Sequence, residues 1–236
     1  SKLLAICCTV VLLAGCEEPK PLSLEEIQEI KNQVNQSGKI THNQAVVLSR
    51  VTYLMLNGLN SLTESQAKVL CKGQTLLVLD GLTSITDRQA KSLSNVLSLS
   101  LDGLTAITDQ QAYSLSRVNK LSLKGLISIT DEQAEDLGKV ELLNLNGLTA
   151  LNDQQAESLS KVETLYLDGL TSITNRQAES LSKVETLYLD GLTSITDEQA
   201  ESLSKVGWLS LNGLPSITDE QAESLSKVET LYLDGL

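Results

Sequence analysis

The sequence predicts an α/β solenoid in which short strands form one parallel sheet on the concave side and short helices cover the convex side. Three observations lead to this prediction. A unit of about 22 residues recurs along most of the chain, aliphatic residues hold fixed positions within it, and a Thr-x-x-Gln motif follows them in almost every unit. A fixed period of this size is typical of stacked repeats and not of one globular core.

The period is clearest in a series of valines that recur at one constant interval. These are Val96, Val118, Val140, Val162, Val184, Val206 and Val228. A length of 236 residues would indicate one or two globular domains, but the repeat predicts a single elongated one. Since aromatic residues make up only 3% of the chain and Phe is absent, we expect a thin core of Leu, Val, Ile and Ala.

The chain opens with SKLLAICCTVVLLAGC, in which a lysine and an apolar run precede small residues and a cysteine. The run is short for a membrane span and is typical of a secretory signal. Leu13-Ala14-Gly15-Cys16 resembles the lipobox of bacterial lipoproteins. That resemblance implies a signal peptide over residues 1–15, a lipid on Cys16, and attachment to the bacterial cell envelope, at the outer membrane or the cell surface. An ordinary signal peptide or an N-terminal anchor helix is the alternative.

Two short segments separate Cys16 from the repeats. Residues 16–22 are polar and contain two prolines, which predicts an extended tether. Residues 23–37 begin with Ser-Leu-Glu-Glu, which has the form of a helix capping box, and apolar residues from Leu24 to Val34 follow at helical spacing. We expect this helix to cover the first end of the solenoid, because terminal repeats have to be shielded from water.

One unit, residues 187–206, shows how each repeat is built. Leu187 and Leu189 alternate with polar residues, so they should face inward from a short strand. Thr196 and Gln199 have the spacing of a capping box that starts a helix of about two turns. Because this helix returns the chain between strands, neighbouring strands have to run parallel.

Two local features depart from the regular unit. The interval from Asn57 to Asp80 is one residue longer than the others, and Gly73 near the insertion predicts a surface loop. Cys71 stands where other repeats carry Ser, which indicates a partly buried, unreactive thiol. The other three cysteines all lie at or before Cys16, so no disulfide framework is expected in the repeats.

The unit resembles a leucine-rich repeat, with Val184-x-x-Leu187-x-Leu189-x-x-Leu192 as the strand segment. The Ile-Thr-Asp that follows is similar to the cysteine-containing subclass, although the unit is shorter than in that subclass. Leu192 occupies a position where the family usually has Asn or Cys, so we expect the side-chain ladder formed there to be missing. The resemblance assigns residues 38–236 to leucine-rich repeats, which we expect to be truncated at the C-terminus because Leu236 lies inside a strand motif.

Composition and motifs argue against several classes of function. The formal net charge of −12 disfavours nucleic acid, since binding phosphates needs clustered Lys and Arg. The single histidine, His42, lies in a helix-cap frame where other repeats have Asp. No phosphate-binding loop, nucleophile motif or metal-ligand cluster occurs, so we expect no enzyme activity, no catalytic residues, no metal and no cofactor.

The outward strand positions are the candidates for binding, because side chains of one column on adjacent strands touch. An early apolar zone contains Tyr53, Met55, Leu76 and Val78, and a central basic zone contains Lys120 and Lys124. The predicted ligand-binding residues form the last zone: Tyr166, Tyr188, Trp208 and Tyr232, with Asp168 and Asp190 beside them. Aromatic rings next to carboxylates can stack on sugars or clamp a peptide.

These features predict a lipid-anchored binding scaffold of the cell envelope that recognises a protein, peptide or glycan through its concave sheet. Three alternatives remain open. Tyr and Thr suit any exposed sheet, the repeats could act as a structural spacer within a larger envelope protein, and the column of Asp residues could hold a cation. Lys124, Asn146 and Asn212 interrupt that column, which favours an ordinary solvated acidic face.

Overall fold

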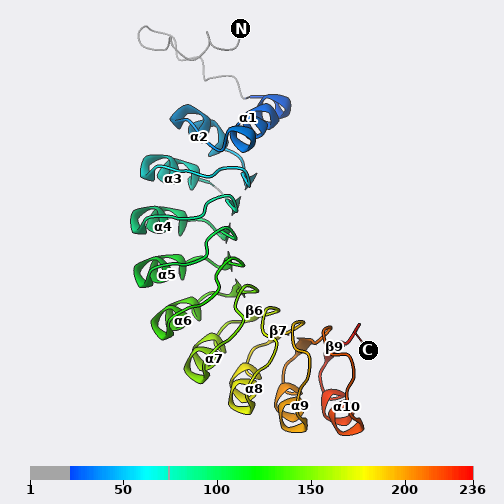
Figure 1. The fold of residues 1–236 in the computed structure, drawn as a ribbon. Helices are drawn as coiled ribbons and strands as arrows, with labels where there is room; N and C mark the ends of the chain where they lie inside the picture. Colours follow the sequence, from blue (N-terminus) through cyan, green and yellow to red (C-terminus); the bar gives the residue numbers. More distant parts are fainter. Residues whose placement is uncertain (1–21, 74, 236) are drawn as a thin grey trace, which may run out of the picture.

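Strands and helices alternate along a curved, open solenoid in the computed structural model, which describes residues 22–73 and 75–235 (Figure 1). Within these residues, nine strands form one parallel sheet in sequence order along the inside of the curve. The first helix lies at the N-terminal end, and the later helices lie on the outside. The predicted fold class is therefore confirmed. The predicted signal peptide, Cys16 and the tether as far as residue 21 lie outside the described residues.

The elements are short and regular after the first helix. The helices are α1 (Leu24–Ser37), α2 (His42–Leu48), α3 (Glu64–Leu70), α4 (Asp87–Leu93), α5 (Asp109–Leu115), α6 (Asp131–Leu137), α7 (Asp153–Leu159), α8 (Asn175–Leu181), α9 (Asp197–Leu203) and α10 (Asp219–Leu225). The strands are β1 (Tyr53–Met55), β2 (Leu76–Val78), β3 (Ser98–Ser100), β4 (Lys120–Ser122), β5 (Leu142–Asn144), β6 (Thr164–Tyr166), β7 (Thr186–Tyr188), β8 (Trp208–Ser210) and β9 (Thr230–Tyr232).

Helix α1 begins with the predicted capping box and packs against α2. The Glu26 amide donates to Ser23 Oγ at 3.2 Å, and the Ser23 amide donates to Glu26 Oε2 at 2.8 Å. Val34 is fully buried, but Leu24 is 86% exposed and does not join the apolar face that its spacing predicted. Gly38 ends the helix in the left-handed conformation, with φ of 69°, which costs glycine little.

A capping box opens every helix from α2 to α10, as the Thr-x-x-Gln motif predicted. In α9 the Gln199 amide donates to Thr196 Oγ1 at 3.1 Å, and the Thr196 amide donates to Gln199 Oε1 at 3.0 Å. Asn152 takes the place of Thr at the start of α7 and makes the same pair of bonds. Each of these short helices therefore begins at a defined residue although it is only about two turns long.

From α3 onward the same glutamines also join each repeat to the one before it, a role that the sequence did not reveal. Gln199 Nε2 donates to the carbonyl oxygen of Ile173 at 2.8 Å, and this bond is buried. The equivalent pairs are Gln66 with Ile40, Gln89 with Leu62, Gln111 with Ile85, Gln133 with Ile107, Gln155 with Ile129, Gln177 with Leu151 and Gln221 with Ile195. We call this series the glutamine ladder. Both ends of each side-chain amide are thereby satisfied in a setting where an unpaired polar group is costly.

Aliphatic side chains fill the space between sheet and helices. Leu187, Leu189, Leu192, Ala200 and Leu203 are fully buried, and their equivalents form one continuous core cluster along the solenoid. The glycine after each strand lets neighbouring repeats approach closely. A Cβ at Gly191 would lie 2.0 Å from the carbonyl oxygen of Asp168, so no larger residue fits without moving the backbone.

The predicted register break lies between β1 and β2. Leu76 pairs with Tyr53 and Ser98 pairs with Leu76, so the first of these two intervals is longer than the second by one residue. Gly73 has a φ of 81°, a left-handed conformation that favours glycine in the connecting loop. Cys71 in the preceding turn is buried, and this burial raises the pKa of its thiol to about 12. Since the thiolate is the reactive form, the structure supports an unreactive Cys71.

The glutamine ladder predicts that Gln199→Glu is destabilising. Glutamate retains an acceptor for the Thr196 amide but places a carboxylate oxygen against the Ile173 carbonyl. We expect a loss of about 2 to 4 kcal/mol at pH 7, measured by urea unfolding. The folded-state pKa of the new carboxyl should lie above its unfolded value, so the loss should shrink below about pH 4, where the acid form can donate.

The matched control is Gln154→Glu, at an exposed helix position where other repeats carry glutamate, such as Glu132. This change should leave the free energy of unfolding within about 0.5 kcal/mol of the original value. Equal effects of the two substitutions would contradict the role assigned to the glutamine ladder.

Candidate functional site

Three columns of side chains face outward from the sheet on the concave side, as its register shows. The strand-start column is Tyr53, Leu76, Ser98, Lys120, Leu142, Thr164, Thr186, Trp208 and Thr230. The strand-end column is Met55, Val78, Ser100, Ser122, Asn144, Tyr166, Tyr188, Ser210 and Tyr232. The ladder column lies two residues further on and is Asn57, Asp80, Asp102, Lys124, Asn146, Asp168, Asp190, Asn212 and Asp234.

The four predicted aromatic residues come together over β6 to β9, although they do not share one column. Tyr166 and Tyr188 stack with ring centroids 4.1 Å apart and an interplanar angle of 11°. Trp208 pairs in register with Thr186, while Ser210 occupies the place between Tyr188 and Tyr232. The Trp208 ring is tilted against Tyr188 at 5.6 Å and against Tyr232 at 5.7 Å. We call these four side chains the aromatic run.

Exposure within the aromatic run increases toward β9. Tyr166 and Tyr188 are half-buried, whereas Trp208 is 37% and Tyr232 is 41% exposed. Burial and then the adjacent Tyr166 side chain raise the pKa of Tyr188 to about 12. The Tyr188 phenol therefore stays neutral at physiological pH and can donate a hydrogen bond.

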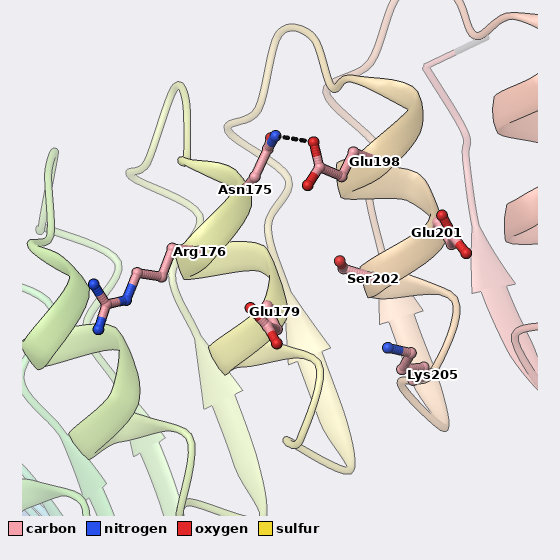
Figure 2. A pocket seen from close by; sticks show the side chains of 7 residues that line it. All are labelled: Asn175, Arg176, Glu179, Glu198, Glu201, Ser202 and Lys205. Atoms are coloured by element: carbon pink, nitrogen blue, oxygen red, sulfur yellow. Dashed lines mark hydrogen bonds between the residues drawn. The ribbon is translucent and has the colours of Figure 1, made fainter.

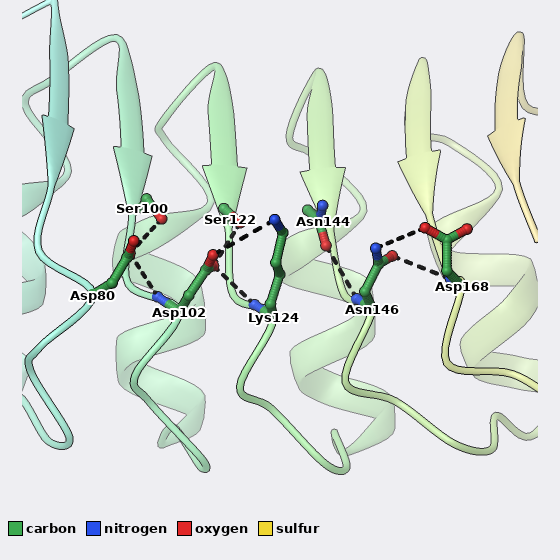
Figure 3. A network of polar contacts seen from close by, with 8 residues as sticks. All are labelled: Asp80, Ser100, Asp102, Ser122, Lys124, Asn144, Asn146 and Asp168. Carbon is green, nitrogen blue, oxygen red and sulfur yellow. Dashed lines mark hydrogen bonds and ion pairs between the residues drawn. The ribbon is translucent and has the colours of Figure 1, made fainter. Parts of the chain in front are cut away.

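The aspartates and asparagines of the ladder column bind the backbone of the next repeat. Asp168 Oδ1 accepts from the Asp190 amide at 3.1 Å, and Asp190 Oδ1 accepts from the Asn212 amide at 3.0 Å. The same bond joins Asp80 to the Asp102 amide and Asp102 to the Lys124 amide (Figure 3). The expectation that a ladder is missing was therefore wrong, because one forms two residues before Leu192.

Lys124 interrupts this ladder, and Asn144 repairs it. The lysine side chain has no acceptor for the Asn146 amide. Asn144, at the end of β5, accepts from that amide instead, at 3.1 Å (Figure 3). Lys124 Nζ lies 3.9 Å from Asp102 Oδ2, and Asn146 Nδ2 donates to Asp168 Oδ2 at 2.7 Å.

Both predicted site carboxylates, Asp168 and Asp190, are thus structural as well as accessible. They lie beside the aromatic run, because each follows a tyrosine of that run by two residues. Burial raises the pKa of Asp168 above its usual range, and the charge of Asp190 raises it further. Within residues 22–73 and 75–235, no group of three or more His, Cys, Asp or Glu is placed to hold a metal ion.

The other two predicted zones differ in accessibility. Tyr53 is 66% and Met55 is 52% exposed, but Val78 is only 7% exposed and contributes little to an apolar surface. Lys120 and Lys124 are exposed in the middle of the sheet. These residues separate the early apolar zone from the aromatic run.

The convex side has a shallow depression between α8 and α9 (Figure 2). Its lining is Asn175, Arg176, Glu179, Glu198, Glu201, Ser202 and Lys205. Asn175 donates to Glu198 across it, while Arg176 turns away toward Asp153 of α7, at 3.8 Å. Its lining residues are largely exposed and none is deeply buried, so the depression lacks the enclosed polar groups of a ligand pocket.

The solenoid is the fold of leucine-rich-repeat proteins. The crystal structure of the leucine-rich-repeat-containing protein LegL7 from Legionella pneumophila matches with a TM-score of 0.57 and 19% identity, over 83% of this chain and 79% of that one. At this identity the similarity shows the fold alone.

Two further solved structures are internalins from Listeria monocytogenes. One matches with a TM-score of 0.48 and 15% identity, over 89% of this chain and 75% of that one. The other, internalin C2, matches with a TM-score of 0.44 and 18% identity, over 80% of this chain and 92% of that one. No family model and no curated protein sequence matches the chain. In the part of the chain that the structure describes, no helix is long and apolar enough to cross a membrane.

The repair of the ladder predicts coupling between Lys124 and Asn144. Asn144→Ala leaves the Asn146 amide without its acceptor and should lower the free energy of unfolding by about 1 to 3 kcal/mol. In a Lys124→Asp background the new carboxylate can accept from that amide, so the same change should cost clearly less. Urea unfolding of the two single variants and the double variant gives the coupling energy. A coupling energy of zero would contradict the repair.

Proposed function

We propose that the aromatic run and its neighbouring aspartates form the ligand-binding surface of a cell-envelope scaffold, which recognises a protein, peptide or glycan through the concave sheet. The observation that carries this proposal is the contact of four aromatic side chains, two of them more than one-third exposed, on one end of that sheet.

Packing of the solenoid does not require these rings. In β3 the same two outward columns hold Ser98 and Ser100, and the strand pairs with its neighbours in the same register. Inward positions are leucine throughout, whether the outward residues are serine, lysine or tyrosine. Exposed Trp and Tyr are favoured anchors at binding surfaces, because they bury a large apolar area and keep a polar group available.

Attachment to a membrane through a lipid on Cys16 belongs to the same proposal. It is supported by the resemblance of Leu13-Ala14-Gly15-Cys16 to a lipobox and by the polar, proline-containing segment that follows. Such a segment would hold the solenoid away from the membrane surface, with the concave face free to reach a ligand.

A structural spacer is the second candidate function. It is favoured by the close identity of the repeats that carry β6 and β7, both of which read Lys-Val-Glu-Thr-Leu-Tyr-Leu-Asp-Gly-Leu-Thr-Ser-Ile-Thr. Identical layers add length without adding a distinct surface. A spacer does not require the Trp208 ring, however. Substitution of this residue therefore distinguishes a spacer from a binding surface.

Replacing Trp208 and Tyr188 together with Ala should abolish ligand capture. The full chain would be screened against envelope proteins, peptides and glycans, and each hit would be measured by calorimetry. Tyr113→Ala on the outer surface of α5 and Tyr53→Ala at the far end of the sheet are matched controls that should retain binding. Thermal melts should show all variants folded. Unchanged capture by the double variant would exclude the aromatic run as the binding surface.

Cys16→Ala tests the proposed anchor separately. Expressed in bacteria with a labelled fatty acid, the original chain should incorporate label and sediment with membranes. The variant should incorporate none and should leave the membrane fraction. Label in the variant, or membrane association that does not depend on Cys16, would contradict lipid attachment at this residue.

A further inference from the structure

The backbone hydrogen bonds of the ladder do not explain the negative charge of Asp168 and Asp190. Asn146 and Asn212 occupy the same column and accept from the next backbone amide just as the aspartates do, at 3.1 and 2.8 Å. The bond to the next backbone amide therefore does not require a negative charge. The other hydrogen bonds of the two carboxylates come from neutral groups: Asn146 Nδ2 donates to Asp168 Oδ2 at 2.7 Å, Asn212 Nδ2 donates to Asp190 Oδ2 at 3.4 Å, and Ser210 Oγ donates to Asp190 Oδ1 at 2.6 Å. These bonds leave the negative charge without a cationic partner.

Within the described ranges 22–73 and 75–235, no ion pair neutralises this charge. Across β6 to β9 the three outward columns contain Asp168, Asp190 and Asp234 and no Lys or Arg. Among the described residues, the ion pair of the ladder column is that of Lys124 with Asp102, in the middle of the sheet. The lysines of this half, such as Lys183, lie in the turns before the strands, where exposed glutamates such as Glu185 follow two residues later.

The arrangement of the rings disfavours a sugar that stacks on them. In the Tyr166 and Tyr188 pair each ring covers one face of the other, at 4.1 Å. The tilted Trp208 ring then contacts Tyr188 and Tyr232. One face of the Tyr166 ring and one face of the Tyr188 ring are therefore unavailable for stacking on a sugar, which requires an open ring face.

A long basic side chain fits both features. The tyrosines end their strands and precede the ladder aspartates by two residues, a distance of about 7 Å at the usual rise of an extended chain. Lys and Arg have aliphatic stems of similar length that lie along apolar surface while the charged group reaches a carboxylate. Arg can also form two parallel hydrogen bonds with one carboxylate.

We propose that the partner of this surface is a basic polypeptide segment, whose Arg or Lys stems pack on the aromatic run while their charged groups pair with Asp168 and Asp190. This inference rests on the proposed function and adds the chemical class of the ligand. Lys120 and Lys124 on the concave side repel such a segment from the middle of the sheet, which confines it to β6 through β9.

Trp208 reports on this surface directly, because it is the single tryptophan of the chain. The full chain would be titrated with a short peptide of alternating Arg and Ser, with the corresponding Glu and Ser peptide, and with a neutral glucose hexasaccharide. We expect saturable change in Trp208 emission with the Arg peptide alone. Asp168→Asn combined with Asp190→Asn should weaken that binding about tenfold, as expected for two exposed ion pairs. The asparagine oxygens can still accept from the Asp190 and Asn212 backbone amides, and thermal melts of the variant should show that it is folded.

Glu179→Gln combined with Glu201→Gln is the matched control, since it removes the same charge from the convex helices. It should leave the affinity for the Arg peptide unchanged. If both pairs of substitutions weaken binding equally, the peptide is held only by long-range attraction to an acidic protein, and the inference is overturned. Absence of binding by the Arg peptide would also overturn it. A third result would also overturn the inference: the hexasaccharide binds the original chain, and calorimetry shows that Trp208→Ala abolishes this binding. That result would nevertheless support the proposed function.

Discussion

The hydrogen bond from each buried glutamine to the preceding repeat is the interaction on which the regular stacking depends. A solenoid repeat contacts only its neighbours, so polar groups buried between layers have to be satisfied there. Gln199 Oε1 accepts from the amide of Thr196, the N-cap residue of its own helix, while its Nε2 donates to Ile173 of the repeat before. One side chain thus sets where a helix begins and how far it lies from the previous layer. The strands then remain in register, and their outward side chains form columns.

A second ladder on the concave side joins each repeat to the next at the strand ends. Asp and Asn accept from the backbone of the next repeat, and the leucines between them fill the core. Where Lys124 cannot accept, Asn144 takes over from an adjacent outward position. Because packing and backbone hydrogen bonds are met by inward residues and by the two ladders, most strand-start and strand-end positions remain free to vary. The aromatic run is built from such positions, and it gives one end of an otherwise repetitive surface a distinct chemistry.

Periodicity was sufficient to predict the solenoid, its parallel sheet, the capping boxes and the register break, because each depends on residues close together in sequence. The second bond of Gln199 joins it to Ile173 in the preceding repeat and depends on how the layers stack, so spacing within a unit does not reveal it. For the same reason the spacing does not reveal the ladder at Asp168 and Asp190, which lies two residues before the position of Leu192 where the family pattern predicts one. One sequence signal could have indicated this ladder. Asn144 is the only asparagine in the strand-end column, and it lies in the repeat directly after Lys124, the one ladder residue that cannot accept a hydrogen bond. Trp208 lies on the predicted face but in a different column from the tyrosines, as the interval of one repeat between Thr186 and Trp208 also indicates.

The side-chain amides of the glutamine ladder are part of the protected interior, which NMR can test directly. Hydrogen exchange of the Nε2 protons of Gln177 and Gln199 would be followed in deuterated solvent, with Gln110 and Gln154 on exposed helix positions as internal references. The ladder predicts that the first two exchange orders of magnitude more slowly than the references, at rates set by opening of the stacked repeats. Exchange of Gln177 and Gln199 as fast as that of the exposed glutamines would contradict the central role given to this bond.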